Sequence, residues 1–342
     1  MFTFQYKLIV SEEVKKILWL HANKLNWLQN YFLAQRIENY KSGIKTSWVD
    51  QNNQLPSLKI QEPILKQIYS QVIQQTAKRL DQSYKNFFRR VKSGKEKAGF
   101  PKFRSCHDFY GITYPQSGYK IKKNKFITKQ YGTLEFTKHR EIKGKIKTVT
   151  ITNKNGEFYL SITTDYNKPK NETKIKEVGI DNKLKNIVVG SDGLKIENKN
   201  HAKYFDKEIA KLQQRQSKCK KGSRQYKYYR TVMNRLYETK VRKMNDFQHK
   251  VSRRLANTYD TIYAEDLSVK NMLKGKKTSL NKAVQNAKFS QLLIFLGYKV
   301  NHLVLVNPKN TSKTCNSCGY VHQNMTLKDR TITCPCGVIY DR

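Results

Sequence analysis

Four cysteines near the C-terminus have the spacing of a metal site. They form two close pairs, Cys315-x-x-Cys318 and Cys334-x-Cys336, at the interval found between the two knuckles of a zinc ribbon. Four thiolates on two tight turns can surround Zn²⁺ tetrahedrally and leave no open position, so we predict a structural zinc ion. His322 is an alternative fourth ligand, and four buried cysteines without metal are a further alternative.

Two acidic residues end short apolar segments with the pattern of buried strands. Asp181 follows Val178-Gly179-Ile180, and Glu265 follows Ile262-Tyr263-Ala264. Each acid alone fits a cap or a turn. If the strands are neighbours, however, the two carboxylates meet at one sheet edge and repel unless a divalent cation lies between them. Phosphodiester hydrolysis uses such clusters to hold two Mg²⁺ ions, so we predict a nuclease site, for which a third carboxylate is expected.

The charge of the chain indicates a polyanionic partner. The 342 residues include 67 Lys plus Arg against 26 Asp plus Glu, a net charge of +41. So large an excess destabilises a compact chain by self-repulsion unless an anion neutralises it, which favours nucleic acid phosphates over a merely solvated basic surface. No segment has the form of a signal peptide or a membrane span, and the cysteines do not form a disulfide framework, so we expect an intracellular protein without a membrane partner.

The first half of the chain predicts a helical region and a β region. The opening "FTFQYKLIV" alternates as a strand, and Ser11 is a candidate N-cap of a following helix. A second helix begins near Pro63 and carries Ile68 and Val72. It ends in a segment where cations alternate with phenylalanines. Such a segment can bind the phosphates of a nucleic acid and stack on its bases; the alternative is a helix end exposed to solvent. Its candidate nucleic-acid-binding residues are Arg89, Arg90 and Lys102.

From about residue 109 to residue 165 the apolar residues recur with a period of two, which predicts strands, and Asn155-Gly156 predicts a hairpin turn. A polar linker at 168–175 then precedes a new domain. The second half alternates strands with a helical hairpin that runs to about Tyr259. A run of residues spaced by three and four, in which Lys240 also falls, has apolar members that predict a packing face, and the other face is dense with cations. That face is either solvated or a wall facing phosphates. The candidate binding residues there are Lys220, Lys221, Arg224, Arg230, Arg253 and Arg254.

These motifs, in this order, resemble the TnpB family of insertion-sequence-encoded proteins, which is related to the type V CRISPR effectors. The segments that carry the resemblance are "VGIDNKLKNIVVGSDG", "DFQHKVSRRLA", "YAEDLSVKNML", "NPKNTSKTCNSCGY" and "TCPCGVIYDR". The resemblance implies a multidomain α+β protein with an RNase H-like (RuvC) α/β nuclease domain and an inserted zinc ribbon. It also implies a wedge-type β-barrel and a helical recognition domain.

The implied domain boundaries are as follows: 1–10, first strand of the wedge barrel; 11–100, helical recognition domain; 101–172, wedge barrel; 173–310, RuvC-like nuclease domain; 311–340, zinc ribbon; 341–342, start of the third RuvC motif.

The family's metal-binding acids fall, residue by residue, on Asp181 and Glu265. Two positions depart from the family pattern. Lys183 stands in a turn where the family usually has Gly, which alters the loop after Asp181. The family's third motif is D-R-D-x-N-A-A, whose metal-binding acid is its second Asp. This sequence supplies Asp341 and Arg342 and ends one residue short of that acid. We therefore expect the polypeptide to cleave weakly or not at all, with Asp341, the neighbour of the expected ligand, as the alternative third acid.

The function that the resemblance implies is RNA-guided cleavage of DNA by two-metal hydrolysis, encoded by a transposable element. The expected cofactors are structural Zn²⁺ and catalytic Mg²⁺, and the partners are a guide RNA from the element's own transcript and target DNA. We expect a monomer within the ribonucleoprotein, in the cytoplasm of a prokaryotic cell and associated with the nucleoid. The alternatives are a nuclease-inactive, guide-dependent DNA-binding protein acting as a repressor, and a transposase or transposase accessory protein.

Overall fold

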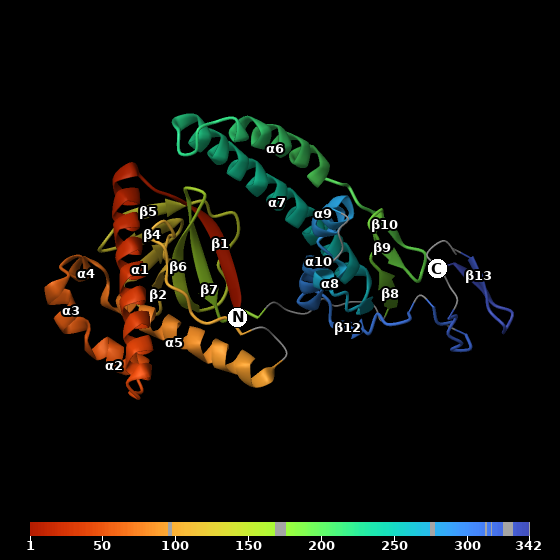
Figure 1. The fold of residues 1–342 in the computed structure, drawn as a ribbon, viewed down its shortest axis with the longest axis horizontal. Helices are drawn as coiled ribbons and strands as arrows, with labels where there is room; N and C mark the ends of the chain where they lie inside the picture. The colour runs from red at the N-terminus through yellow and green to blue at the C-terminus, as the bar shows by residue number, and fades with distance from the viewer. Residues whose placement is uncertain are drawn as a thin grey trace. The chain divides into compact units, whose positions relative to one another are not determined.

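The computed structural model describes residues 1–94, 98–167, 176–273, 278–311, 313–315, 317–323 and 331–341. They form two compact units, Met1–Lys168 and Pro169–Arg342, each with its own hydrophobic core (Figure 1). The predicted linker at 168–175 and the terminal Arg342 lie outside the described residues.

The helices of the first unit are more numerous than the two that the sequence predicts, one after Ser11 and one near Pro63. Ser11 caps the first helix as predicted, because its Oγ accepts a hydrogen bond from the N–H of Val14. The single helix expected after Pro63 is instead two helices, since Ile68 has an extended backbone that turns its side chain into the core. The helices are α1 (Glu12–Lys41), α2 (Trp48–Asn53), α3 (Leu55–Gln61), α4 (Ile64–Gln67) and α5 (Ser70–Ser93).

The strands of the first unit form one curved, nearly closed sheet with the order β2-β6-β7-β1-β5-β4-β3, whose pairs are all antiparallel. The first strand of the chain thus lies at its centre. The two edge strands approach each other, with the rings of Tyr114 and Tyr119 5.9 Å apart. The strands are β1 (Phe2–Ile9), β2 (Ile112–Tyr114), β3 (Tyr119–Lys122), β4 (Lys125–Thr128), β5 (Gly132–Phe136), β6 (Ile146–Lys154) and β7 (Glu157–Thr164).

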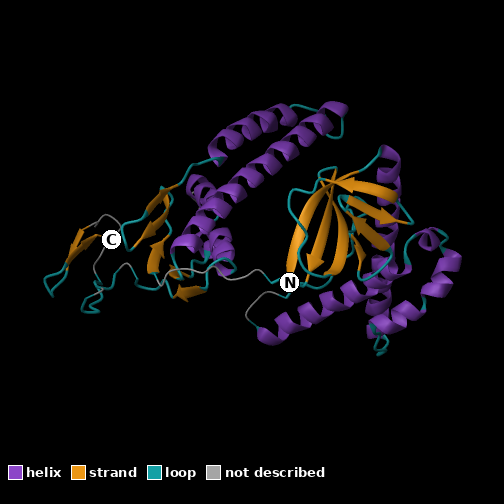
Figure 2. Ribbon diagram, turned by 180° about the vertical axis from the view of Figure 1, so that it is seen from behind, coloured by secondary structure: helices purple, strands orange, loops and turns teal. Residues whose placement is uncertain are grey.

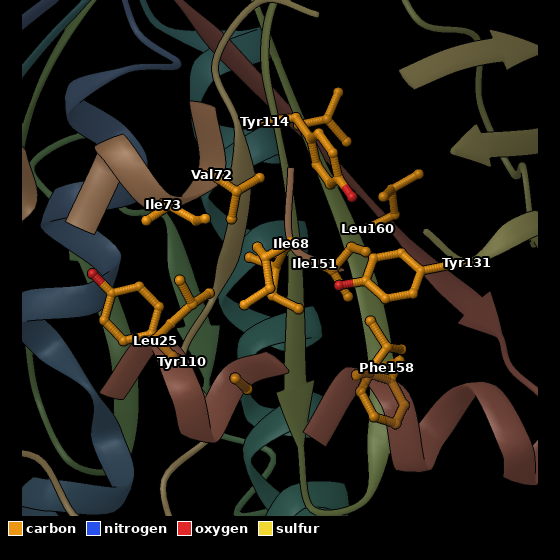
Figure 3. Packing of buried hydrophobic residues seen from close by; sticks show 14 of the residues in the cluster. Leu25, Ile68, Val72, Ile73, Tyr110, Tyr114, Tyr131, Ile151, Phe158 and Leu160 are labelled. Carbon is orange, nitrogen blue, oxygen red and sulfur yellow. The ribbon is translucent and has the colours of Figure 1, made fainter. Parts of the chain in front are cut away.

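The core of the first unit lies between this sheet and its helices. Figure 3 shows Leu25 of α1 and Val72 of α5 on the same side of the sheet as Ile151 and Leu160. All four side chains are at most 2% exposed. Burial of each such side chain contributes about 1.5–3 kcal/mol, so helices and sheet stabilise one another as a single body.

The second unit contains a five-stranded sheet with the order β10-β9-β8-β11-β12. The first three strands along the chain form an antiparallel meander, and the last two run parallel to the first of them (Figure 2). The strands are β8 (Glu177–Asp181), β9 (Asn186–Gly190), β10 (Lys195–Glu197), β11 (Thr261–Glu265) and β12 (His302–Val306). A separate antiparallel pair, β13 (Thr331–Thr333) and β14 (Ile339–Asp341), lies near the C-terminus.

A helical hairpin connects the meander to the parallel strands. Figure 1 shows its two helices side by side and antiparallel. The second carries Val251 and Leu255 into the core, where they pack with Leu292 and Leu296. Within the described residues no helix combines the length and apolarity needed to cross a membrane. The helices are α6 (Ala202–Ser217), α7 (Arg224–Thr258), α8 (Val269–Met272), α9 (Thr278–Ala287) and α10 (Phe289–Gly297).

Lys240 faces inward on α7, although the packing prediction covered only the apolar members of the same run of residues. Its Nζ lies 2.7 Å from Oδ1 of Asp206 on α6, and both side chains are nearly covered. Asn286 of α9 donates to the other carboxylate oxygen at 2.9 Å. One carboxylate therefore joins three helices of the second unit.

We expect Asp206→Asn to lower the free energy of unfolding by about 2 kcal/mol near neutral pH, because it leaves the covered Lys240 without its counter-ion. Burial raises the pKa of Asp206, but the hydrogen bonds from Lys240 and Asn286 outweigh it and leave that pKa below its ordinary value of 3.8. A lowered folded-state pKa stabilises the fold above the unfolded pKa, and this contribution is lost as the pH falls through the folded pKa. The difference between the two proteins should therefore shrink in acid.

Urea unfolding followed by circular dichroism measures this effect. The matched control is Asp246→Asn, which removes the same charge from an exposed ion pair with Lys250. The control should lose less than about 0.5 kcal/mol. Equal losses in the two variants would contradict the structural role of Asp206.

Candidate functional site

The two acids that the sequence singled out lie side by side at one edge of the five-stranded sheet. Strands β8 and β11 are parallel neighbours, and Ile180 pairs with Ala264 in their register. Asp181 and Glu265 are the next residues of the two strands, so both side chains emerge at the carboxyl edge. The condition that the sequence left open, that these strands be neighbours, is fulfilled.

Each carboxylate has a different polar partner. The Nζ of Lys183 lies 3.3 Å from Oδ2 of Asp181, and about half of each side chain is exposed. The hydroxyl of Thr311 donates a hydrogen bond to Oε1 of Glu265. Thr311 follows β12 in a polar segment, where the sequence offers no periodicity or motif that would connect it to β11. The pairing with Glu265 could be found only from the fold.

Asp341 stands apart from these two acids in the sheet topology. It is the last residue of β14, and its backbone pairs with Thr331 of β13 rather than with the five-stranded sheet. Its side chain lies outside what the structure describes. Its role as a third acid stays a prediction.

The acidic edge has the donor chemistry of a Mg²⁺ site. Mg²⁺ binds hard oxygen ligands, usually one or two carboxylates, and keeps several of its waters. Asp181 is exposed and Glu265 is half-buried, so a hydrated cation can reach both. The residues present therefore fit such an ion.

The four predicted cysteine ligands come together. Their Sγ atoms all lie within 4.8 Å of one another. The separations are 3.8 Å for Cys315 and Cys336 and 3.5 Å for Cys318 and Cys334. Zn–S bonds of about 2.3 Å in a tetrahedron place sulfur atoms about 3.8 Å apart, so the cluster fits Zn²⁺. His322 is not a member of this group among the described residues.

The backbone prepares the two knuckles for a metal. Gly319 and Gly337 both have positive φ, of 74° and 83°, and each donates its N–H to the carbonyl of the first cysteine of its knuckle. Hydrogen bonds from the backbone of Cys318 and Ser317 lower the pKa of the Cys315 thiol to about 6, whereas burial raises the pKa of Cys334 to about 12. Binding of Zn²⁺ would therefore be coupled to release of protons.

The predicted nucleic-acid-binding residues do not form one patch. Lys220 and Lys221 lie in the turn between α6 and α7, with Arg224 and Arg230 on the following helix. All four are exposed. Arg253 and Arg254 lie near the other end of α7, whose 35 residues span about 50 Å. The hairpin thus carries two separate basic regions.

A groove of about 590 Å³ marks the second of these regions. Arg253 and Arg254 line it together with His249, Lys250, Asn257 and Thr258. The imidazole of His249 stacks on Phe295 with ring centres 3.8 Å apart. Burial, followed by the nearby charge of Lys299, lowers the pKa of His249, so the ring stays neutral at physiological pH. The sequence did not single out His249.

The third basic region lies at the end of α5 in the first unit. Arg89 and Lys102 are exposed, and Arg90 is half-buried. Beside them lies a group of mutually contacting aromatic rings that includes Phe88 and Phe100, which are 58% and 45% exposed. Exposed rings between cations suit stacking on unpaired bases.

Two protein families match the chain. The family described as "Probable transposase" (OrfB_IS605) matches residues 158–276, and the family described as "Cas12f1-like, TNB domain" matches residues 289–342. The first segment contains Asp181 and Glu265, and the second contains the four clustered cysteines.

Similar proteins match along most of the chain. InsQ of Escherichia coli (strain K12), whose assigned name is that of an RNA-guided DNA endonuclease, is 27% identical over 92% of this chain and 82% of InsQ. A Streptomyces pristinaespiralis protein with the same assigned activity is 27% identical over 87% of this chain and 75% of that protein. A chain in the cryo-EM structure of the Cas12f1–sgRNA–target DNA complex has a similar fold, with a TM-score of 0.54 and 15% identity, over 92% of this chain and 77% of that one.

The fold and the site together define a class of mixed α/β proteins with a nearly closed sheet and a cluster of four cysteines that fits a zinc ribbon. The motifs and the matches point to the same family. Along most of its length the chain is similar to proteins of the TnpB family.

We expect the purified protein to contain about one zinc ion per chain, because the cluster offers four sulfur ligands at bonding separation. Cys334→Ser should lose most of this zinc, as measured by inductively coupled plasma mass spectrometry. Cys219→Ser, which removes a cysteine outside the cluster, is the matched control and should keep it. Equal zinc contents in the two variants would contradict the assignment.

Proposed function

We propose that this chain is an RNA-guided DNA endonuclease whose hydrolytic site is the acidic sheet edge of Asp181 and Glu265. The observation that carries the proposal is the parallel pairing of β8 and β11, which aligns the two carboxylates. Carboxylates are scarce in a chain with a net charge of +41, so two of them at one sheet edge suggest a chemical role. The assigned names of the relatives support the same activity.

The five-stranded sheet supports an RNase H-like (RuvC) assignment for the second unit. Its antiparallel meander is followed by two strands parallel to the first, and helices connect them, as suits the α/β nuclease domain that the family resemblance implies. We extend the proposal to the domain boundaries given above, in which the nearly closed sheet is the wedge barrel and α1–α5 form the recognition domain. The cysteine cluster would then be the inserted zinc ribbon.

In the proposed mechanism Asp181 and Glu265 would hold Mg²⁺ at the sheet edge. Bound there, the ion would supply positive charge for activating a water molecule and for stabilising the leaving oxygen. Thr311 orients the Glu265 carboxylate through its hydrogen bond. The basic regions on α5 and on the α6–α7 hairpin hold phosphates of the guide and the target, while base pairing with the guide supplies sequence specificity.

The proposed partners are target DNA and a guide RNA transcribed from the same transposable element. The fold shared with Cas12f1, whose structure was determined with sgRNA and target DNA, supports both partners. We propose one chain per ribonucleoprotein. The location in the cytoplasm near the nucleoid stays a prediction.

The test is cleavage of a plasmid by the chain co-purified with its RNA, after that RNA has been sequenced and a matching target built. In line with the expectation from the third motif, we expect weak Mg²⁺-dependent cleavage by the wild-type chain and its loss in Asp181→Asn and Glu265→Gln, because each removes an anionic ligand. Both variants should still bind guide and target. Asp246→Asn, which removes an exposed acid from α7, is the control and should cleave normally.

Two results would overturn the proposal. Cleavage by Asp181→Asn at the wild-type rate would remove the acidic edge from the mechanism. Guide-dependent binding of DNA by the wild-type chain without cleavage at any Mg²⁺ concentration would instead favour the nuclease-inactive binding protein.

A further inference from the structure

The Asp181 carboxylate already has a cationic neighbour in this chain. Lys183, two residues further on, places its ammonium 3.3 Å from Oδ2 of Asp181. Glu265 differs, because its polar contact is the neutral hydroxyl of Thr311. Among the contacts of the described residues, the ion pair with a side chain is thus found at Asp181.

The loop that carries Lys183 is firmly anchored. The N–H of Lys183 donates to the carbonyl of Asn186 at 3.0 Å, which closes the turn between β8 and β9. Asn198 holds the same loop twice, through its N–H to the carbonyl of Lys185 at 2.8 Å and through its side chain to the carbonyl of Leu184 at 3.1 Å. Leu184 also packs against the core of the second unit. The base of the Lys183 side chain is therefore fixed close to Asp181.

A divalent cation and an ammonium compete for the same carboxylate. Both are attracted by its negative charge, and a metal ion bound to Oδ2 would meet Lys183 at a distance where two positive charges repel. The ammonium must move away for the metal ion to bind. In the absence of metal, the same contact relieves the repulsion between the neighbouring carboxylates of Asp181 and Glu265.

We propose that Lys183 is a built-in competitor of the divalent cation at Asp181, so that the site fills only at a higher metal concentration than the two acids alone would require. The inference rests on the proposed function of Asp181 as a metal ligand. Lys183 is a positioning residue in this role, because it acts on the site through Asp181.

A titration of the zinc-loaded full chain with Mn²⁺ tests the proposal without relying on activity. Electron paramagnetic resonance measures the free Mn²⁺ at each point, and the bound Mn²⁺ is the difference from the total. Binding that remains in an Asp181→Asn/Glu265→Gln double variant is subtracted as background. We expect the Mn²⁺ concentration at half-saturation to be about two- to fivefold lower for Lys183→Met than for the wild-type chain. This factor corresponds to the strength of an exposed ion pair. Lys183→Arg keeps the charge and should bind as the wild type does.

Lys185→Met is the matched control, since it removes the same charge from an exposed position in the same loop. Its half-saturation should stay within about 1.5-fold of the wild type, because a charge without contact to the carboxylate is screened by solvent. Circular dichroism and the thermal midpoint of each variant show whether it is folded. Because the Lys183 side chain is half-exposed, we expect its variants to fold as the wild type does.

The outcomes separate the two levels of the proposal. Wild-type binding by Asp181→Asn would overturn the proposed metal site itself. Loss of binding in Asp181→Asn, combined with unchanged or weaker binding in Lys183→Met, would overturn the role of Lys183 while the metal site stands. Equal tightening by Lys183→Met and Lys185→Met would also overturn it, because the effect would then be one of general charge.

Discussion

The parallel pairing of β8 with β11 is the constraint on which the proposed site depends. Val178 and Ile180 on one strand, and Ile262 and Ala264 on the other, are almost completely buried and so fix which residues of each strand face the core. A slip of one residue would turn these side chains to the opposite face of the sheet. The hydrophobic core of the second unit thus also sets the positions of the two carboxylates that follow the buried residues.

A second constraint is the excess of positive charge. With a net charge of +41 the protein must limit repulsion among its own cations, and its few acids are used in different ways. Asp206 neutralises the covered Lys240 inside the helical layer, whereas Asp181 lies at an open sheet edge. The candidate binding cations lie at or after the end of α5, at the turn between α6 and α7, and near the end of α7. Phosphates bound there would neutralise charge that the fold itself does not.

The sequence predicted what local spacing and burial determine, and missed what depends on contacts between distant segments. The cysteine spacing predicted the cluster, and the apolar pattern before Asp181 predicted its strand. The extended backbone at Ile68 was missed, because an apolar residue at helical spacing can enter a core from either conformation. Thr311 was missed because its contact with Glu265 spans a long stretch of chain and leaves no periodic pattern.

The central claim is that Asp181 and Glu265 share a divalent cation, and anomalous scattering from Mn²⁺ in crystals of the chain tests it most directly. The account predicts a strong anomalous peak within about 2.2 Å of a carboxylate oxygen of each residue, with the Lys183 ammonium displaced from Asp181. A saturated crystal with no peak between the two carboxylates, and with the contact of Lys183 to Asp181 intact, would contradict it.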